Sequence, residues 1–429
     1  MVAVAPFRAL RYNLERIGDL SAVVAPPYDV ISSEAQAALY EASPYNIVRL
    51  ILGKQFPDDT DTSSRYTRAK ATFDEWRASG VLIEDRQPAI YLCEQTFTWE
   101  GQTHQRLGFI ALLMFNGSVS PTGTSPGHVL KHEATFSAPK ADRTKLIDAV
   151  QANLSPIFCI VPDTSQGHYG QMRALAQRQA PLASIRVPAK TPGTGWEQIR
   201  FWAIQDPTFN TALQEGLAPA RALIADGHHR FEVALSRRHL AAGVMAYFAW
   251  REDPAVVVRP IHRVVRVEPA MQNAWRSRLE AACHLQPVGS LAEAARGAGG
   301  QGRFGYYEQG RWSLASVKDD VLADWLLHPS VPLALAGLDV SILHQFLIPQ
   351  LMGGSQVQAA SADSFCRYTP DASEAVAMVG RGKGTCAWLL RGIPLDQVFA
   401  LAEQGIALPQ KSTYFYPKVL SGLCLFPFH

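Results

Sequence analysis

One segment near the middle of the chain constrains its fold more than any other. The segment RALIADGHHRFEVAL, residues 221–235, begins with five mostly apolar residues that are typical of a buried strand. It continues with the turn-forming run DGHHR and then with a stretch in which Phe231, Ala234 and Leu235 share one helical face. The chain is therefore predicted to pass here from a buried strand directly into a helix.

Such a turn is suited to binding phosphate. A helix N-terminus presents backbone N–H groups and a partial positive charge, and Gly227 lets an anion approach the backbone closely. Arg230 can bind two phosphate oxygens, and His228 and His229 are further donors. Asp226 repels phosphate, so we expect it to hold a magnesium ion or an incoming hydroxyl. The residues alone leave one alternative open, a capped and solvated turn, because Asp-Gly is common in turns and Asp is a good N-cap.

The composition excludes two broad classes of protein. With 429 residues, the chain is too long for one ordinary compact domain and fits two or three subdomains. Hydrophobic residues make up 47% and charged residues 18%, which allows a large core and argues against disorder. The net charge of +2 is too small for a general nucleic-acid binder. An enzyme, a nucleotide-binding regulator and a non-catalytic scaffold all stay open.

The sequence also predicts a cytoplasmic protein without a membrane partner. No apolar run approaches the roughly 20 residues needed to cross a bilayer. The first residues, MVAVAPFRALRYN, lack a basic region followed by a long apolar stretch, so we read no signal peptide. The six cysteines form no C-x-x-C pair, which favours reduced, mostly buried thiols over disulfides or a zinc site; they are Cys93, Cys159, Cys283, Cys366, Cys386 and Cys424.

Local patterns predict several elements on either side of the central turn. Tyr66, Ala69, Phe73 and Trp76 are spaced as one face of a helix. Two apolar runs around Glu100-Gly101 indicate a β-hairpin. Residues 162–215 are expected to be an insertion with helical pieces. Together these patterns predict an α+β protein.

Other polar residues are candidates for a substrate pocket or a phosphate contact, and each also has an ordinary structural explanation. Tyr28 and Asp29 follow two prolines in a rigid turn and can form a pocket wall. Arg49 and His262 interrupt apolar runs that we expect to be strands, where each can reach a ligand or pair with an acid at the rim of a sheet. The remaining candidates are as often solvated surface residues as ligands; they are His132, Glu133, Lys140, Asp142, Arg143, Lys411 and Lys418.

A wider set of motifs resembles a bacterial family, the domain of unknown function number 1015. The motifs run in order along nearly the whole chain, and their combination is specific. They are APPYDVI (25–31), KHEATFSAPKADRTKLI (131–147), NLSPIF (153–158), IADGHHRFEVAL (224–235), PIHRVV (260–265), LDVSILH (338–344) and KSTYFYPKVLSGL (411–423).

The order of H-E, a basic helix, S-P-I-F and D-G-H-H-R is also distantly similar to the ParB/sulfiredoxin superfamily, and within it to the free-serine kinases. This resemblance implies that Glu133, next to His132, is the catalytic base. It implies that the turn binds the nucleotide phosphates and the group being transferred, through Asp226, Gly227, His228, His229 and Arg230. About 90 residues separate the glutamate from the turn, more than the fold needs, so a sizeable insertion intervenes.

The resemblance implies three segments. The first, residues 1–119, is an N-terminal α/β segment. The second, residues 120–270, is a ParB/sulfiredoxin-like nucleotide-binding core with the insertion near 162–215. The third, residues 271–429, is a C-terminal α/β segment.

The function implied is a small-molecule kinase that uses ATP or ADP and Mg²⁺ to convert free L-serine, or a similar hydroxy compound, to O-phosphoserine. Lys140, Asp142 and Arg143 would add a phosphate contact or a metal ligand. The alternative is a ParB-like regulator that binds and hydrolyses nucleotide without phosphorylating an acceptor.

Overall fold

The computed structural model describes residues 1–115, 128–163, 167–188, 196–327, 331–354 and 365–428. The fold is mixed α+β, as predicted. The chain divides into two compact units. Unit 1 comprises Met1–Lys131, Thr135–Val257 and Pro417–His429, and unit 2 comprises His132–Ala134 and Val258–Tyr416.

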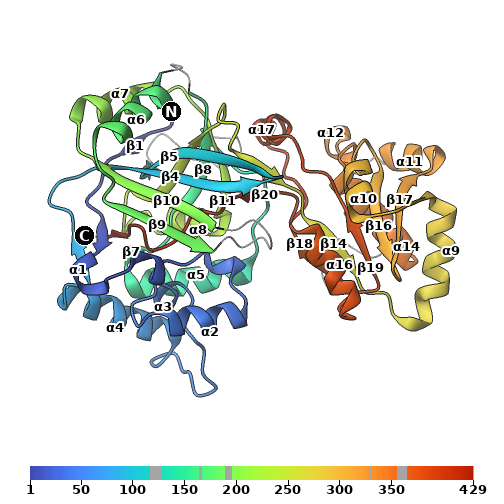
Figure 1. The fold of residues 1–429 in the computed structure, drawn as a ribbon, viewed down its shortest axis with the longest axis horizontal. Helices are drawn as coiled ribbons and strands as arrows, with labels where there is room; N and C mark the ends of the chain where they lie inside the picture. Colours follow the sequence, from blue (N-terminus) through green and yellow to red (C-terminus); the bar gives the residue numbers. More distant parts are fainter. Residues whose placement is uncertain (116–127, 164–166, 189–195, 328–330, 355–364, 429) are drawn as a thin grey trace. The chain divides into compact units, whose positions relative to one another are not determined.

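A nine-stranded mixed sheet forms the centre of unit 1 (Figure 1). β11 lies parallel to β6 and antiparallel to β8, β8 is parallel to β12, and the remaining pairs are antiparallel. The order is β6 (Val129–Leu130), β11 (Ala222–Asp226), β8 (Ile157–Val161), β12 (Gly243–Trp250), β5 (Gln102–Met114), β4 (Ile90–Trp99), β10 (Trp196–Ile204) and β9 (Ala183–Pro188), with β1 (Val4–Ala5) paired to β5.

This sheet joins parts of the chain that the sequence assigned to separate segments. β4 and β5 come from residues 1–119, whereas β8, β11 and β12 come from 120–270. The described part of the region 162–215 has helical segments, as predicted, but it also supplies β9 and β10, which continue the sheet beyond β4. The units therefore differ from the three predicted segments, because strand pairing follows the sheet and not the order of the chain.

The predicted hairpin and the predicted helix of the N-terminal region are both confirmed. β4 and β5 pair from Tyr91↔Ile110 to Trp99↔Gln102. The two turn residues Glu100 and Gly101 both have positive φ, 49° and 76°, as a two-residue hairpin turn requires. The helix is α4 (Arg65–Ala78), which buries Ala69, Phe73 and Trp76.

The strand predicted around Arg49 is wrong, because this residue lies in the short helix α3 (Val48–Ile51). Val48, Leu50 and Ile51 are buried there. A short buried helix has the same kind of continuous apolar run as a buried strand, so the sequence pattern does not distinguish the two. The other helices of unit 1 are α1 (Leu14–Ile17), α2 (Ser33–Ala42), α5 (Ser137–Val150), α6 (His168–Arg178), α7 (Pro207–Leu217) and α8 (His228–Ser236).

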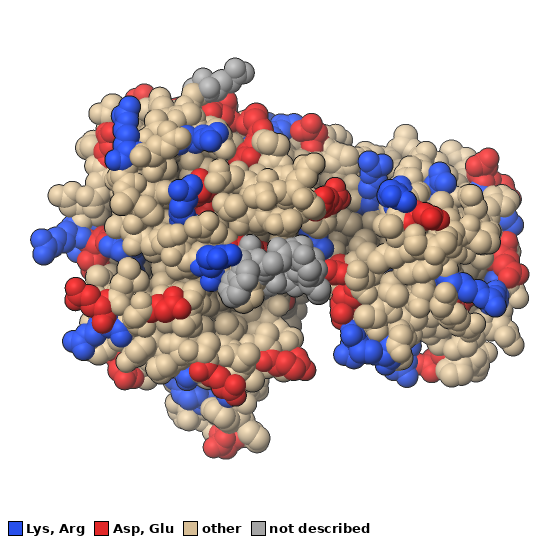
Figure 2. All heavy atoms as spheres, in the orientation of Figure 1, with Lys and Arg blue, Asp and Glu red and all other residues tan. Residues whose placement is uncertain are grey.

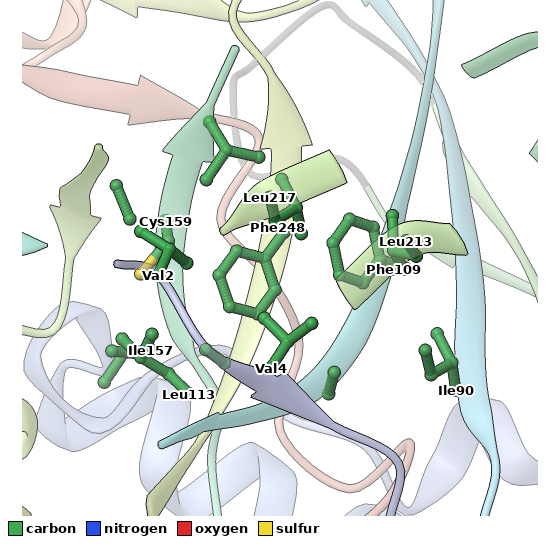
Figure 3. Packing of buried hydrophobic residues seen from close by; sticks show 14 of the residues in the cluster. Val2, Val4, Ile90, Phe109, Leu113, Ile157, Cys159, Leu213, Leu217 and Phe248 are labelled. Atoms are coloured by element: carbon green, nitrogen blue, oxygen red, sulfur yellow. The ribbon is translucent and has the colours of Figure 1, made fainter. Parts of the chain in front are cut away.

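The main core of unit 1 lies on the central sheet (Figure 3). Phe109 of β5 and Phe248 of β12 stack with their ring centroids 4.9 Å apart. Leu213 and Leu217 of α7 pack onto the same cluster, which also holds Val4. The cluster fixes β11 and β8 in the sheet, since Ile224 and Cys159 belong to it. The end of β11 is therefore held in place by a closely packed core.

Unit 2 has its own six-stranded antiparallel sheet and its own core. Val264, Ala387 and Leu389 of the sheet pack with Ala294 and Ala375 of two helices. The strand order is β15 (Cys283–Val288), β17 (Arg311–Val317), β16 (Arg303–Glu308), β19 (Cys386–Leu389), β14 (His262–Val265) and β18 (Cys366–Thr369).

Within the described residues, the helices of unit 2 are α9 (Gln272–Ala282), α10 (Leu291–Gly297), α11 (Asp319–Leu326), α12 (Leu333–Ala336), α13 (Asp339–Ser341), α14 (Ile348–Met352), α16 (Ala372–Gly380) and α17 (Leu395–Glu403). The short strands outside the two large sheets are β2 (Leu10–Tyr12), β3 (Leu82–Glu84), β7 (Ala152–Asn153), β13 (Val257–Arg259), β20 (Tyr414–Tyr416) and β21 (Phe426–Pro427).

Among the described residues, no helix has the length and apolar character needed to cross a membrane. On the face in view in Figure 2, the Lys and Arg side chains of the described residues are interspersed with Asp and Glu side chains. This mixture agrees with the net charge of +2. All six cysteines are free and buried, as predicted.

Candidate functional site

The predicted strand-turn-helix is present at residues 222–236. β11 has four buried residues and ends at Asp226, and α8 begins at His228. Gly227 lies between them with φ of +91°, in the left-handed region that favours glycine. Its carbonyl accepts from Phe231 N at 2.9 Å, and Phe231 is buried in the core. The N-terminus of α8 is therefore fixed by a glycine turn at the edge of a packed sheet.

Asp226 lies between two cations. Its Oδ1 accepts from Lys418 Nζ, and its Oδ2 accepts from Arg230 Nη2 at 2.7 Å. All three side chains are largely buried, with exposed fractions of 9 to 12%. Burial alone would raise the pKa of the Asp226 carboxyl, but the charges of Lys418 and Arg230 outweigh burial and lower the pKa to about 2.

Arg230 folds back over the turn. It also donates from Nη1 to the carbonyl of Pro156, just before β8. A Cβ added to Gly227 would meet the Arg230 guanidinium carbon at 3.0 Å. Glycine is therefore needed at 227 for its backbone conformation and also for the space that Arg230 occupies.

The two histidines of the turn differ in their surroundings. His228 is buried. The ring of His229 stacks on the Phe136 ring, with centroids 6.4 Å apart and planes 14° apart, and its Nε2 accepts from Phe136 N at 2.9 Å. An Nε2 that accepts a hydrogen bond belongs to a neutral imidazole with its proton on Nδ1.

Glu232, one turn into α8, binds three side chains of the segment around Glu133. Its carboxylate accepts from Thr135 Oγ1 at 2.6 Å and pairs with Lys131 and Lys140 at 3.1 Å each. Burial would raise the pKa of Glu232, but these three hydrogen bonds lower it. Lys140, predicted as a phosphate contact, thus has a carboxylate partner. Sequence reasoning missed Glu232, because nothing in the residues around it signals these distant partners.

In unit 1, Arg143 contacts two other candidates, Tyr28 and Asp142. The Arg143 guanidinium lies over the Tyr28 ring, 3.9 Å from its centroid, and donates from Nε to Asp142 Oδ2 at 2.7 Å. Asp142 is shared with Arg65 and accepts from Tyr66 Oη at 2.6 Å. Burial raises the pKa of Tyr28 to about 12, so its hydroxyl stays protonated at neutral pH.

His132 and Glu133 are grouped with unit 2. His132 is fully buried, and its Nε2 is 2.9 Å from Thr413 Oγ1. Glu133 forms a parallel bridge with Leu408, whose N–H donates to the carbonyl of His132 at 2.8 Å. That Glu133 faces the turn at Asp226 stays a prediction.

Of the remaining candidates, Asp29 and Arg49 lie in unit 1, and His262 and Lys411 lie in unit 2. Asp29 is exposed. Arg49 donates to the carbonyl of Tyr40 at 2.9 Å and lies 4.4 Å from the Tyr40 ring centroid. His262 is buried in unit 2, as predicted on a strand, where Nδ1 accepts from Leu390 N at 3.2 Å and burial lowers its pKa to about 3. Lys411 is exposed at a position with φ of +55°.

The described residues do not fit the magnesium site expected at Asp226. Among them, no group of three or more His, Cys, Asp and Glu side chains is arranged to hold a metal ion. Both oxygens of Asp226 are bound to cations, and Arg230 and Lys418 would repel a divalent ion. The arrangement instead suits an anion, because two cations share one carboxylate at a helix N-terminus.

Three solved structures are similar to this chain at low TM-scores. A free serine kinase in complex with AMP is 12% identical, with 67% of this chain and 83% of that chain covered and a TM-score of 0.32. SbnI with a C-terminal truncation, from Staphylococcus aureus, is 10% identical, with coverages of 73% and 85% and a TM-score of 0.34. A conserved hypothetical protein from Pyrococcus furiosus is 13% identical, with coverages of 68% and 89% and a TM-score of 0.32.

No curated protein matches the chain. A family model does match, over residues 4–341, which is well over half of the sequence. The matched range includes the Asp226 turn, α5 and Glu133, and it ends before Lys418. The chain belongs to the family described as "Protein of unknown function (DUF1015)".

Proposed function

We propose that this protein is a nucleotide-dependent phosphotransferase that converts free L-serine, or a similar hydroxy compound, to its phosphate ester. The observation that supports it most is the turn at Asp226-Gly227, where Arg230 and Lys418 share one carboxylate at the start of α8. The motif similarity to the free-serine kinases, described above, supports the reaction type. We also propose that the sheet around β11 and β8 is a ParB/sulfiredoxin-like core.

The phosphoryl donor, ATP or ADP, would bind this turn through its terminal phosphates. The first N–H groups of a helix have no partner within the helix and carry a partial positive charge. Arg230, Lys418 and Asp226 together carry a net charge of +1 when all are ionised, and this charge favours a phosphate that lies against them. Gly227 carries no side chain that would hinder this approach.

Glu133 would act as the general base. The acceptor hydroxyl oxygen attacks the terminal phosphorus, and the bond from phosphorus to the bridging oxygen breaks, so that the nucleotide leaves with the electron pair. The hydroxyl proton passes to the Glu133 carboxylate. Removing such a base lowers the rate by about 100-fold to 10,000-fold. Lys131 and Thr135, two residues to either side of Glu133, are both bonded to Glu232 of α8.

The experiment is a phosphoryl-transfer assay with L-serine, magnesium salt and a panel of nucleotides. We expect O-phosphoserine from the wild-type protein and a loss of at least about 100-fold in kcat for Glu133→Gln, with nucleotide affinity within twofold of wild type. Folded protein that forms no phosphoserine with any donor would contradict the proposal. Nucleotide binding and hydrolysis without transfer would favour the regulator of the ParB type, and no saturable nucleotide binding would favour a scaffold.

A further inference from the structure

A small cavity in unit 1 adjoins the first turn of α8. Arg230 of α8 lines one part of it, and Arg143 of α5 lines another. Tyr28 and Ser155 add a phenol ring and a hydroxyl, whereas Val233, together with neighbouring aliphatic side chains, makes the remaining wall apolar. We call this cavity the Arg143–Arg230 pocket.

Each guanidinium of the pocket belongs to a cluster in which two cations share one carboxylate. Asp142 is shared by Arg65 and Arg143, and its pKa is lowered because these charges and the Tyr66 hydroxyl outweigh burial. Asp226 is shared by Arg230 and Lys418. Each cluster therefore has a net charge of +1 at neutral pH, so the pocket lies between two centres of positive charge.

Arg143 retains donors for a ligand. Its Nε and Nη2 bind Asp142, and its Nη1 donates to the carbonyl of Ile51 at 2.8 Å. A guanidinium has five N–H donors, so two of them are left when the bonds within the described residues are counted. A carboxylate is the group whose two oxygens match such a fork.

The size of the pocket decides between the two parts of the reaction that it could hold. Its cavity volume is about 50 Å³. A cavity of roughly 150 Å³ is known to accept a benzene ring, so a purine base is too large for this pocket. A carboxylate on a short aliphatic chain fits the volume, the charge and the apolar wall.

We infer that the Arg143–Arg230 pocket binds the carboxylate end of the acceptor, so that the acceptor is a short hydroxy acid or hydroxy amino acid and not a neutral alcohol. This inference rests on the proposed function. The carboxylate binds Arg143, and the hydroxyl end extends toward Arg230, which lies in the first helical turn beside the phosphate site. The pocket thereby selects the acceptor by charge and sets its direction.

The test measures binding by calorimetry, without turnover, for L-serine and glycerate, each against its neutral amide. We expect each acid to bind at least about tenfold more tightly than its amide. Arg143→Met should reduce this preference to less than about threefold and leave ADP affinity within twofold of wild type. Val233→Met fills the pocket without changing charge and should weaken both acids about tenfold or more.

Thermal melting establishes that each variant is folded, and Val233→Met provides the test if Arg143→Met does not fold. Arg237→Met is the matched control, because Arg237 pairs with the partly exposed Asp148 in the same unit and neither residue lines the pocket. The inference is overturned if neither acid outbinds its amide, or if the folded variants bind both acids as wild type does. Acid-selective binding without phosphoryl transfer supports the pocket and contradicts the proposed function; transfer with unchanged acceptor KM in both variants does the reverse.

Discussion

The replacement Asp226→Asn tests the electrostatic design of the turn. It keeps the shape of the side chain but removes the charge that Lys418 and Arg230 share. The pKa of Asp226 is lowered from 3.8 to about 2, which corresponds to about 2 kcal/mol of preference for the charged form in the folded protein. Removing one partner of a buried ion pair costs about 3–5 kcal/mol, since the other charges stay buried. We therefore expect the free energy of unfolding of unit 1 to fall by about 2–4 kcal/mol at pH 7.

The sign of the pH dependence follows from the direction of the same pKa. A carboxyl whose pKa is lower in the folded protein stabilises the fold fully above its unfolded pKa of about 4, and it loses this contribution as the pH falls toward 2. The stability difference between wild type and Asp226→Asn should therefore be largest at pH 5–7 and should shrink between pH 4 and pH 2.

The assay is urea unfolding followed by circular dichroism, together with hydrogen exchange of peptides from β11 and α8, because two units can unfold separately. Asp74→Asn is the matched control. Asp74 pairs with Lys70 on α4, where both side chains are about half exposed, so its loss should change stability by less than about 0.5 kcal/mol. The reasoning is refuted if Asp226→Asn is as stable as the control at pH 7, or if its deficit is the same at pH 7 and pH 2.5.

Three further predictions concern the same turn, the segment tied to it and unit 2. Gly227→Ala should lower the free energy of unfolding by about 1–2 kcal/mol because of its positive φ, and it should also weaken nucleotide binding by displacing Arg230. The control is Gly80→Ala, which has φ of +73° and no atom within 4 Å of the added Cβ. In the same urea and nucleotide titrations it should show only the loss of stability. Glu232→Gln should lower kcat about tenfold or more and speed hydrogen exchange in residues 131–140, with unchanged nucleotide affinity, and equal kcat would show that this carboxylate does not position the segment. Burial lowers the His262 pKa to about 3, so unit 2 should lose stability as the pH falls from about 6.5 toward 3. His262→Asn keeps an acceptor for Leu390 N, and its stability should fall less over this pH range. A pH profile identical to wild type in urea unfolding would contradict this.

The parts of the fold that the sequence predicted correctly are those set by neighbouring residues. The turn from β11 into α8 follows from an apolar run, a glycine and a helical spacing within fifteen residues. The hairpin at Glu100-Gly101 is fixed by two residues that both adopt positive φ. In each case the physical cause lies within the segment itself.

The parts that it missed depend on contacts between distant residues. Lys418 lies 192 positions from Asp226, and their ion pair forms only because the end of the chain returns to unit 1. The segment that contains β10 was read as an insertion, yet β10 pairs with β4 across the sheet. Glu232 has no unusual sequence context, and its role appears only when Lys131 and Lys140 are seen on its carboxylate.

These distant contacts also change the chemistry expected at the turn. If the turn binds phosphate, the sequence alone leads us to expect that Asp226 holds a magnesium ion or an incoming hydroxyl, because a carboxylate repels phosphate. Lys418 supplies the charge that a metal would have supplied, and Arg230 supplies a second. With both oxygens of Asp226 bound to cations, the carboxylate serves to hold Arg230 and Lys418 in fixed positions at the start of α8. A phosphate at this turn would then meet cations that are already oriented, and this lowers the cost of arranging them when the nucleotide binds.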